Sequence, residues 1–285
     1  MAGGAVPGCG VPNARGETPL ELFDMHCHLG FSPDASQAAQ SLAELGAGGL
    51  SVTVEPGEFE RVSAELAGDG IGGSGGSDDG TLASAPASVR VAAGLHPWWV
   101  ADGRCGAAEI ARAAEHAARS AFVGEVGLDF GRARAGTENA QREAFSRIVD
   151  ACAQGGCARL VSIHAVRAAG EVLDVLERCD LPQRCACVLH WFSGASDELA
   201  RAVRMGCFFS VGPRMIATKR GRAYARAVPA ARLLLETDLP SAAGEAWSAE
   251  AHARALRETA SALEELCGVG TAARIAQTSR ELLLV

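Results

Sequence analysis

Eight short apolar segments recur along this chain, and segments with helical periodicity separate them. Runs of this length are typical of strands that are buried on both faces of a parallel sheet. We expect strands at 22–29, 49–54, 89–95, 122–126, 160–163, 185–189, 207–211 and 233–236, and helices that include 34–45, 59–66, 107–119, 138–154 and one closing helix at 249–266. Eight repeats in one chain of 285 residues favour an α/β fold, a single closed (β/α)8 TIM-like barrel, over an open doubly wound sheet.

Residues 20–285 are expected to form this one barrel domain, because a chain that is 48% hydrophobic can bury one large core. Residues 1–19 lack periodicity and contain Gly, Pro and Asn, which indicates a flexible lead-in. Residues 68–80 are rich in Gly and Ser and indicate a flexible surface insertion that carries no chemistry. The functional residues are therefore expected in the remaining segments.

Charge and composition argue against several classes of protein. The net charge of −8 argues against binding nucleic acid through bulk charge, so an anionic substrate must be attracted by a metal ion or a local basic patch. No apolar run reaches the roughly 20 residues that a membrane span needs, and residues 1–16 lack the apolar core of a signal peptide. The ten cysteines are scattered, and most lie in apolar stretches, which indicates reduced, buried thiols. We expect a cytoplasmic protein that does not bind membranes.

The first apolar segment contains a His-x-His pair. Side chains alternate between the two faces of a strand, so Asp24, His26 and His28 are expected on one polar face. Phe23 and Met25 are expected on the other face, packed under a helix. Two imidazoles side by side at the mouth of a barrel could hold one metal ion, although two buried, hydrogen-bonded histidines would give the same pattern.

Four further residues with metal-ligand chemistry stand at the C-terminal ends of predicted strands, namely Glu125, His164, His190 and Asp238. Barrel enzymes build their active sites at that end, and scattered core histidines would show no such regularity. The joint pattern therefore predicts a metal site formed by these four residues with His26 and His28.

The other histidines are interpreted differently. His96 also ends a predicted strand, but Pro97 turns the chain at once, which favours a donor that faces the substrate over a metal ligand. Simple hydrogen bonding within the loop is the alternative. His116 and His252 lie on predicted helices, away from the strand ends, and are expected on the surface.

Six motifs, in this order, resemble the TatD family of metal-dependent deoxyribonucleases, which are relatives of the amidohydrolases. The matching pieces are Asp24-Met-His-Cys-His28, Gly94-Leu-His-Pro-Trp98, Gly124-Glu-Val-Gly-Leu-Asp129, Ser162-Ile-His164, His190-Trp-Phe-Ser-Gly194 and Glu236-Thr-Asp-Leu-Pro240. The resemblance implies that His26, His28 and Asp238 hold one divalent ion, that His164 and His190 hold a second, that Glu125 bridges the two, and that His96 contacts the scissile phosphate.

Chemistry agrees with two divalent ions, Zn²⁺, Mn²⁺ or Mg²⁺, in a site of imidazoles and carboxylates. Two such ions need a bridging anion, and some amidohydrolase relatives use a carboxylated lysine for this. The only lysine here, Lys219, follows the seventh predicted strand and is poorly placed, so Glu125 is the expected bridge. Asp238 is expected to ligate a metal and to act as the general base. Asp129 is expected either to orient a metal ligand or to cap the turn after its strand.

Residues 199–235 contain no Asp or Glu but several basic residues. Arg214, Lys219, Arg220 and Arg222 follow the seventh predicted strand, so we expect them on the active-site face, where they could pair with phosphate oxygens. Four aromatic residues follow the ends of the third and sixth predicted strands and could either stack on bases or pack under the rim: Trp98, Trp99, Trp191 and Phe192.

The chain departs from the family pattern on the substrate side. His164 and Arg167 stand three apart instead of two, which leaves open whether Arg167 reaches the phosphate. Ser241-Ala-Ala-Gly-Glu245 stands where the family carries Arg-Asn-x-Pro, and Gln277-Thr-Ser-Arg280 replaces a segment that usually contains asparagine. The basic residues after the seventh predicted strand nevertheless favour a nuclease, and we expect a monomer that acts on single-stranded or frayed DNA ends. The alternatives are a hydrolase of a small phosphate ester, amide or lactone, and a non-catalytic barrel protein.

Overall fold

The structure, a computed structural model, describes residues 21–68 and 88–284. The expected lead-in at 1–19 and nearly all of the expected insertion at 68–80 lie outside these residues. Within the described ranges, none of the helices has both the length and the apolar character of a bilayer-spanning helix.

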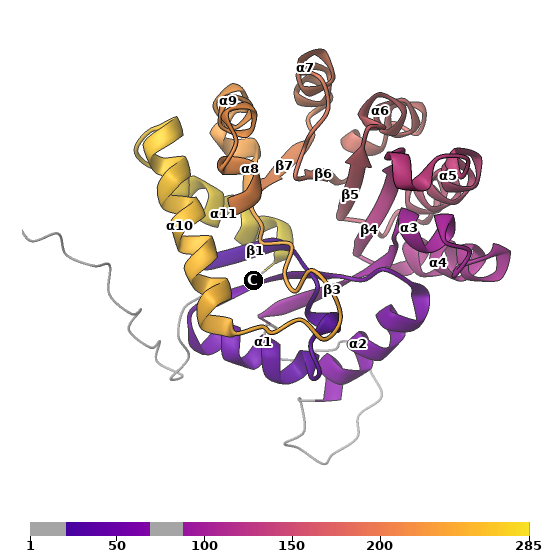
Figure 1. Ribbon diagram of the computed structural model, residues 1–285, viewed down its shortest axis with the longest axis horizontal. Helices are drawn as coiled ribbons and strands as arrows, with labels where there is room; N and C mark the ends of the chain where they lie inside the picture. Colours follow the sequence, from indigo (N-terminus) through magenta and orange to yellow (C-terminus); the bar gives the residue numbers. More distant parts are fainter. Residues whose placement is uncertain (1–20, 69–87, 285) are drawn as a thin grey trace, which may run out of the picture.

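Eight parallel strands close into a barrel in sequence order, so the predicted (β/α)8 fold is confirmed. The helices form a ring around the strands (Figure 1). The strands are β1 (Leu22–Cys27), β2 (Ala47–Val52), β3 (Val89–Leu95), β4 (Phe122–Asp129), β5 (Leu160–Val166), β6 (Ala186–His190), β7 (Phe208–Val211) and β8 (Leu233–Leu235). The helices are α1 (Ala35–Glu44), α2 (Pro56–Gly68), α3 (Pro97–Ala101), α4 (Ala107–Arg119), α5 (Glu138–Gly155), α6 (Ala169–Arg178), α7 (Ser196–Met205), α8 (Pro213–Ile216), α9 (Lys219–Ala227), α10 (Ala249–Cys267) and α11 (Thr271–Leu283).

Local signals explain several helix boundaries. The side chain of Asp34 accepts a hydrogen bond from Gln37 N and caps α1, and Ser248 caps α10 in the same way. Proline occupies the first turn of α3 and of α8, where its missing N–H has no helical partner. Gly206 follows α7 with φ of 86°, a conformation that glycine adopts without steric strain.

Two apolar layers stabilise the barrel. Leu160, Val188 and Leu234 belong to an inner cluster, whereas the residues on either side of them in β6 and β8 pack against the helices. Leu283 at the end of α11 is buried in the inner cluster, where it covers the starts of the strands. The helix predicted at 249–266 is confirmed as α10, but the expectation of a single closing helix was wrong, because α11 follows α10 and closes the N-terminal end of the barrel.

Strand β1 differs from the predicted pattern of alternation. The pairing with β2 slips between Asp24 and Cys27, where β1 carries one residue more than its partner. Phe23 and Met25 therefore lie in the inner cluster and not under a helix. Because of the extra residue, the consecutive side chains of Met25 and His26 both face the interior of the barrel.

Two further expectations of burial were wrong. His252 is 0% exposed and not a surface residue, because its ring lies between α10 and the carboxylate of Asp24. Cys157, one of the cysteines in apolar stretches that were expected to be buried, is exposed, because it follows the end of α5 and lies outside the core.

Candidate active site

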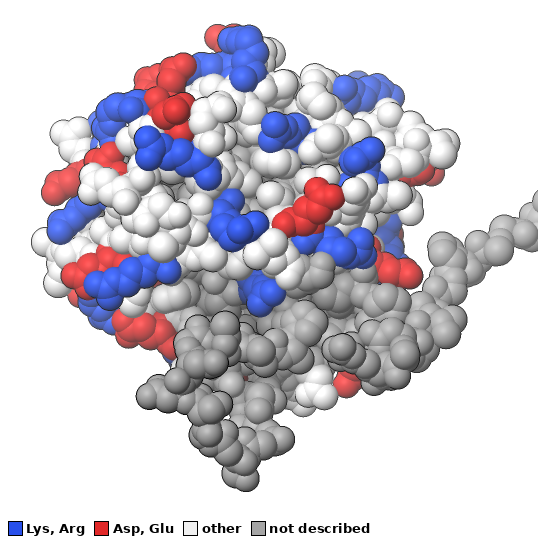
Figure 2. All heavy atoms as spheres, turned by 180° about the vertical axis from the view of Figure 1, so that it is seen from behind, with Lys and Arg blue, Asp and Glu red and all other residues white. Residues whose placement is uncertain are grey.

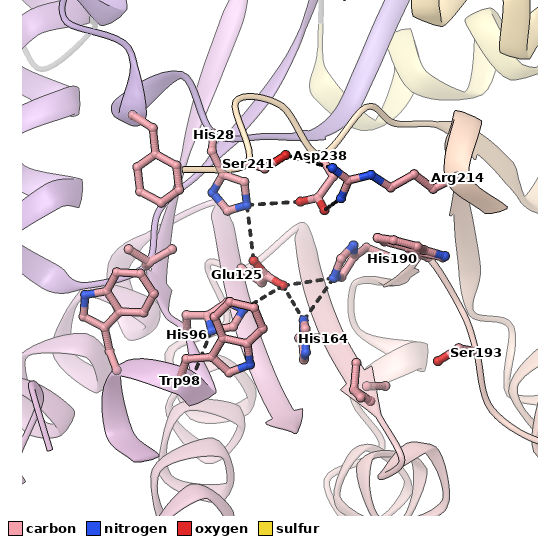
Figure 3. A pocket seen from close by; sticks show the side chains of 16 residues that line it. His28, His96, Trp98, Glu125, His164, His190, Ser193, Arg214, Asp238 and Ser241 are labelled. Atoms are coloured by element: carbon pink, nitrogen blue, oxygen red, sulfur yellow. Dashed lines mark hydrogen bonds and ion pairs between the residues drawn. The ribbon is translucent and has the colours of Figure 1, made fainter. Parts of the chain in front are cut away.

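Six predicted ligand residues and His96 meet at the C-terminal mouth of the barrel, where they line or border one cavity of about 410 Å³ (Figure 3). Glu125 lies at the centre of the group. Its side chain is 2% exposed, and each of the five strand-end histidines places a ring nitrogen within 3.4 Å of one of its oxygens. The site therefore consists of residues that are far apart in the sequence but lie at the ends of neighbouring strands.

The two oxygens of Glu125 divide the histidines into two groups. Oε2 lies 3.4 Å from Nε2 of both His26 and His28. Oε1 lies 2.7 Å from His164 Nδ1 and 2.9 Å from His190 Nε2. A carboxylate with one oxygen in each group has the geometry of a bridge between two cations.

Asp238 completes the first group. Its Oδ1 lies 3.4 Å from His28 Nε2 and 3.8 Å from His26 Nε2. The residue stands three positions after the end of β8 and has φ of 61°, and its side chain lines the cavity. His26, His28 and Asp238 offer ligand atoms that all lie within 4.8 Å of one another, as do His26, Glu125 and His190.

Burial and the neighbouring carboxylates shift the pKa values of these groups in opposite directions. Burial alone would lower the pKa of His28, but Asp238 and Glu125 raise it to about 10, and contacts with nearby carboxylates, including Glu125, likewise raise the pKa values of His164 and His190. Burial lowers the pKa of His26 to about 4, so this ring is neutral at neutral pH. Burial alone would raise the pKa of Glu125, but the surrounding histidines lower it well below its usual range. Burial is likewise outweighed at Asp238, where His28 and other histidines lower the pKa to about 2. Divalent metals bind neutral imidazoles and ionised carboxylates, so a cation at this site would replace the protons that the carboxylates favour on His28, His164 and His190.

One buried nitrogen atom without a partner supports metal binding. His26 Nε2 is buried and makes no hydrogen bond. Leaving buried polar atoms unpaired costs free energy, which a metal ion would recover at His26 Nε2, because this atom faces the carboxylates of Glu125 and Asp238. The nitrogen and oxygen donors fit Zn²⁺ or Mn²⁺ and can accept Mg²⁺.

Three residues lie behind the predicted ligands and contact their rings. Ser162 Oγ lies 2.7 Å from His26 Nδ1, and Asp129 Oδ2 lies 3.4 Å from His164 Nε2. Glu236 Oε2 accepts a 2.5 Å hydrogen bond from Ser210 and lies 3.6 Å from His190 Nδ1. Each contact is made by one ring nitrogen, and the other nitrogen of the same ring faces Glu125. Histidines that bind metals are commonly held in this way by a hydrogen-bond partner on the second nitrogen.

Sequence reasoning missed Ser162 and Glu236 as site residues, although the signal was present. Ser162 stands two residues before His164 on β5, and alternation places both side chains inside the barrel. Glu236 stands directly after β8, two residues after the inward-facing Leu234. Burial raises the pKa of Glu236 to about 6, despite its contacts with His190 and Ser210.

Asp129 lies in the site and also closes the turn after β4. Its Oδ1 accepts a hydrogen bond from Gly131 N at 2.7 Å, and its Oδ2 accepts one from Trp98 Nε1 at 2.6 Å. Asp129 thus makes the contacts of both roles expected from the sequence, the turn cap and the orienting partner of His164.

His96 has the geometry of a hydrogen-bond donor. Its Nδ1 accepts the backbone N–H of Trp98 at 3.1 Å, so the proton of the neutral ring lies on Nε2. Nε2 is 3.3 Å from Glu125 Oε1 and faces the cavity. Burial lowers the pKa of His96, which keeps the ring neutral. His96, Glu125 and His164 also form a third group of closely spaced ligand atoms.

Two glycines let the strands that carry these residues approach one another. A Cβ atom at Gly94 would lie 1.7 Å from the carbonyl oxygen of Thr53 and 2.7 Å from Glu125 N. A Cβ atom at Gly127, where φ is 149°, would lie 2.0 Å from the carbonyl oxygen of His164. Any other residue at these positions would push apart the strand ends that hold Glu125 and His164.

The predicted basic residues occupy different places. Arg214 on α8 borders the cavity, with Nη1 3.7 Å from Asp238 Oδ2 and Nη2 bonded to Ser241 Oγ at 3.0 Å. Arg220 donates hydrogen bonds to the carbonyl oxygens of Ser193 and Gly194, and Arg222 donates one to that of Ile216. Lys219 and Arg167 are exposed and do not line the cavity.

Of the five arginine and lysine residues predicted to contact phosphate, the structure therefore brings only Arg214 to the cavity wall, where His96 also lies. Figure 2 shows Lys and Arg side chains spread singly among Asp, Glu and uncharged residues on the face behind that of Figure 1.

A separate group of ligand-type residues lies behind the site, formed by Asp24, Cys27 and His252. The Asp24 carboxylate already accepts hydrogen bonds from His26 N, from the N–H and hydroxyl of Thr237, and from His252 Nε2. We interpret it as a hydrogen-bonded structural centre that holds β1 against the end of β8.

Comparison with known proteins agrees with this geometry. The model of the family described as TatD related DNase matches residues 23–282. The 3'-5' ssDNA/RNA exonuclease TatD of Enterobacter lignolyticus is 33% identical over 166 residues, which cover 56% of this chain and 61% of that protein. The protein of the same name from Edwardsiella piscicida is 36% identical over 121 residues, or 41% of this chain and 45% of that one. The chain thus spans about half the length of these curated relatives.

Solved structures match over nearly the whole chain. YjjV, a TatD homologue from Escherichia coli K12, aligns with a TM-score of 0.69 at 25% identity, covering 92% of this chain and 96% of that chain. A TatD family hydrolase from Entamoeba histolytica aligns with a TM-score of 0.71 at 12% identity, covering 93% and 98%, which shows a shared fold. The family match over residues 23–282 shows that the chain belongs to the TatD-related DNase family.

Proposed function

We propose that this protein hydrolyses phosphodiester bonds of nucleic acid as a TatD-like, metal-dependent deoxyribonuclease. The observation that carries the proposal is the position of Glu125, whose two oxygens face two separate groups of histidines at the mouth of the barrel. The names of the curated relatives, which are exonucleases of single-stranded DNA and RNA, support nucleic acid as the substrate.

The proposal assigns the ligands of two divalent ions. His26, His28 and Asp238 would hold one ion, His164 and His190 would hold the other, and Glu125 would bridge them. Ions held by these residues would supply a water of lowered pKa, about 7, and positive charge to offset that of the attacked phosphate. Zn²⁺, Mn²⁺ and Mg²⁺ are the candidates.

The residues around the ligands would then carry out the remaining steps. Asp238 is ionised at neutral pH and faces the cavity, so it can accept the proton of the attacking water. His96 would donate its Nε2–H to an oxygen of the scissile phosphate. Arg214 would bind a second phosphate oxygen from the opposite wall (Figure 3). The Trp191 ring packs against Arg214, with its centroid 5.4 Å from the guanidinium carbon.

A specific observation favours a second candidate, hydrolysis of a small phosphate ester. Arg220 and Arg222 bind backbone carbonyls, so an extended phosphate track beyond Arg214 has less support than the sequence suggested. A cavity of about 410 Å³ is large enough for one small substrate. Both candidates use the same metal site and differ in what binds outside it.

One experiment separates the two candidates. The protein, stripped with chelator and reconstituted with Mg²⁺, Mn²⁺ or Zn²⁺, is incubated with end-labelled single-stranded DNA, duplex DNA, RNA and a small phosphodiester. We expect cleavage of single strands, loss of activity on metal removal, and about two metal ions per chain by elemental analysis. Hydrolysis of the small ester alone would exclude the nuclease.

Matched histidine variants test the site itself. His190→Ala should lose bound metal and activity together, because it removes a ring 2.9 Å from the bridging carboxylate. His116→Ala should keep both, because His116 lies on α4 and contacts Glu60. Full metal content in His190→Ala would contradict the assignment.

The monomeric state and the cytoplasmic location stay predictions.

A further inference from the structure

The aromatic residues near the site differ in how they are packed. Phe192 is 3% exposed and packs edge-on against Phe209 in the core, so it cannot meet a ligand. Trp98 is 41% exposed. Among the described residues, it is the one large hydrophobic side chain that is both exposed and part of the cavity lining. An aromatic surface left open at a pocket is available for a ligand, since burying it there is favourable.

Trp98 is held in one orientation although it is exposed. Its Nε1 donates a 2.6 Å hydrogen bond to Asp129 Oδ2. The guanidinium carbon of Arg134 lies 5.0 Å from the ring centroid, and Asp102 holds Arg134 through a 2.5 Å ion pair. A ring fixed before binding loses little conformational entropy when a ligand stacks on it.

The ring lies beside the residues that would handle the phosphate. Its centroid is 5.0 Å from that of His96 and 6.3 Å from that of His164, with both pairs in edge-to-face geometry (Figure 3). Because one sugar separates the base and the phosphate of a nucleotide, a phosphate beside His96 would bring its own nucleobase to Trp98.

We propose that Trp98 is the stacking platform for the nucleobase next to the scissile phosphate. This inference rests on the proposed nuclease function and adds the residue that would select an unpaired base at the cut, whichever of the bases it is. Every base has a flat face, so stacking tolerates sequence, whereas a paired base must first leave its duplex.

The test combines two changes, one in the protein and one in the substrate. Trp98→Leu keeps an apolar side chain but removes the ring, and Trp98→Phe keeps a ring without the Nε1–H. The substrates are an oligothymidylate and the same strand with one base replaced by an abasic tetrahydrofuran, placed in turn at each position near the cut. Initial rates at low substrate concentration give kcat/KM.

On the normal strand, Trp98→Leu should lower kcat/KM by about 5- to 150-fold, the factor that corresponds to the loss of one stacked base. When the missing base is at the position that stacks on Trp98, kcat/KM of the wild type should fall by a similar factor. Trp98→Leu should then lower kcat/KM on that abasic strand little further. Trp98→Phe should retain most of the preference for the base. Trp99→Leu is the matched control, because Trp99 also lines the cavity, and it should affect the two substrates equally.

Equal losses on both substrates in Trp98→Leu would overturn the platform and would assign Trp98 only to the support of Asp129. An unchanged rate on the normal strand would overturn it as well. If the wild type cleaves no oligonucleotide with any metal, the nuclease function fails, and the platform fails with it. Cleavage without dependence on the base refutes the platform alone.

Discussion

Replacing His252 by Phe would remove hydrogen bonds at a buried carboxylate while the new ring still fills the space. His252 Nε2 lies 2.7 Å from Asp24 Oδ2, and its Nδ1 accepts a 3.1 Å hydrogen bond from Trp247 Nε1. The Trp247 bond places the proton of the neutral ring on Nε2, where it donates to Asp24. The same carboxylate binds His26 N and Thr237, which precedes Asp238.

The expected cost follows from these contacts. A hydrogen bond to a charged group contributes about 1.5–3 kcal/mol, and a buried donor without an acceptor costs about 1–3 kcal/mol. Asp24 keeps its other donors, and Trp247 is only partly buried, so both contributions should fall near their lower limits. We expect His252→Phe to lower the free energy of unfolding by about 2–4 kcal/mol.

The assay is urea unfolding of metal-free protein, followed by circular dichroism. His116→Phe is the control, because His116 is the other helical histidine and contacts an exposed carboxylate of Glu60. Exposed pairs contribute at most about 1 kcal/mol, so this control should change stability little. Equal effects of the two substitutions, or less than about 1 kcal/mol for His252→Phe, would refute the role given to the buried contacts.

Three further predictions concern the site and its surroundings. Asp238→Asn should lower kcat by roughly 10²–10⁴ while at least one metal ion remains bound; full activity would exclude Asp238 as the base. Glu236→Gln should weaken metal binding by about 10–100-fold, measured by competition with a chromogenic chelator, because the carboxylate lies 3.6 Å from His190 Nδ1; unchanged affinity would rule out this support. Burial raises the pKa of Glu58 above 4.5, so the folded state binds more protons than the unfolded state above that pH, and stability is lost as pH rises. Glu58→Gln should therefore gain stability relative to the wild type between pH 4.5 and pH 8 in unfolding titrations, and a constant difference would contradict this assignment.

The barrel and the positions of the ligand residues follow from local patterns. A parallel strand inside a ring of helices is buried on both faces, so each strand appears as an apolar run that can be read without a structure. On β5 and β6, alternation continues from the core residues Leu160 and Val188 to His164 and His190 at the mouth. Strand ends of a closed barrel meet in space, so residues there could be grouped before any distance was known.

Other features depended on contacts that local patterns do not contain. A bulge of one residue reverses the faces of β1, and its position depends on pairing with β2. His252 and His116 both stand on amphipathic helices, but only His252 faces a buried carboxylate. The basic residues after β7 form one charged run in the chain, yet the turn from α8 to α9 leaves Arg214 at the cavity and directs Arg220 and Arg222 to backbone carbonyls. Register, helix rotation and loop direction are decided by packing between distant segments, and only the tertiary structure contains that packing.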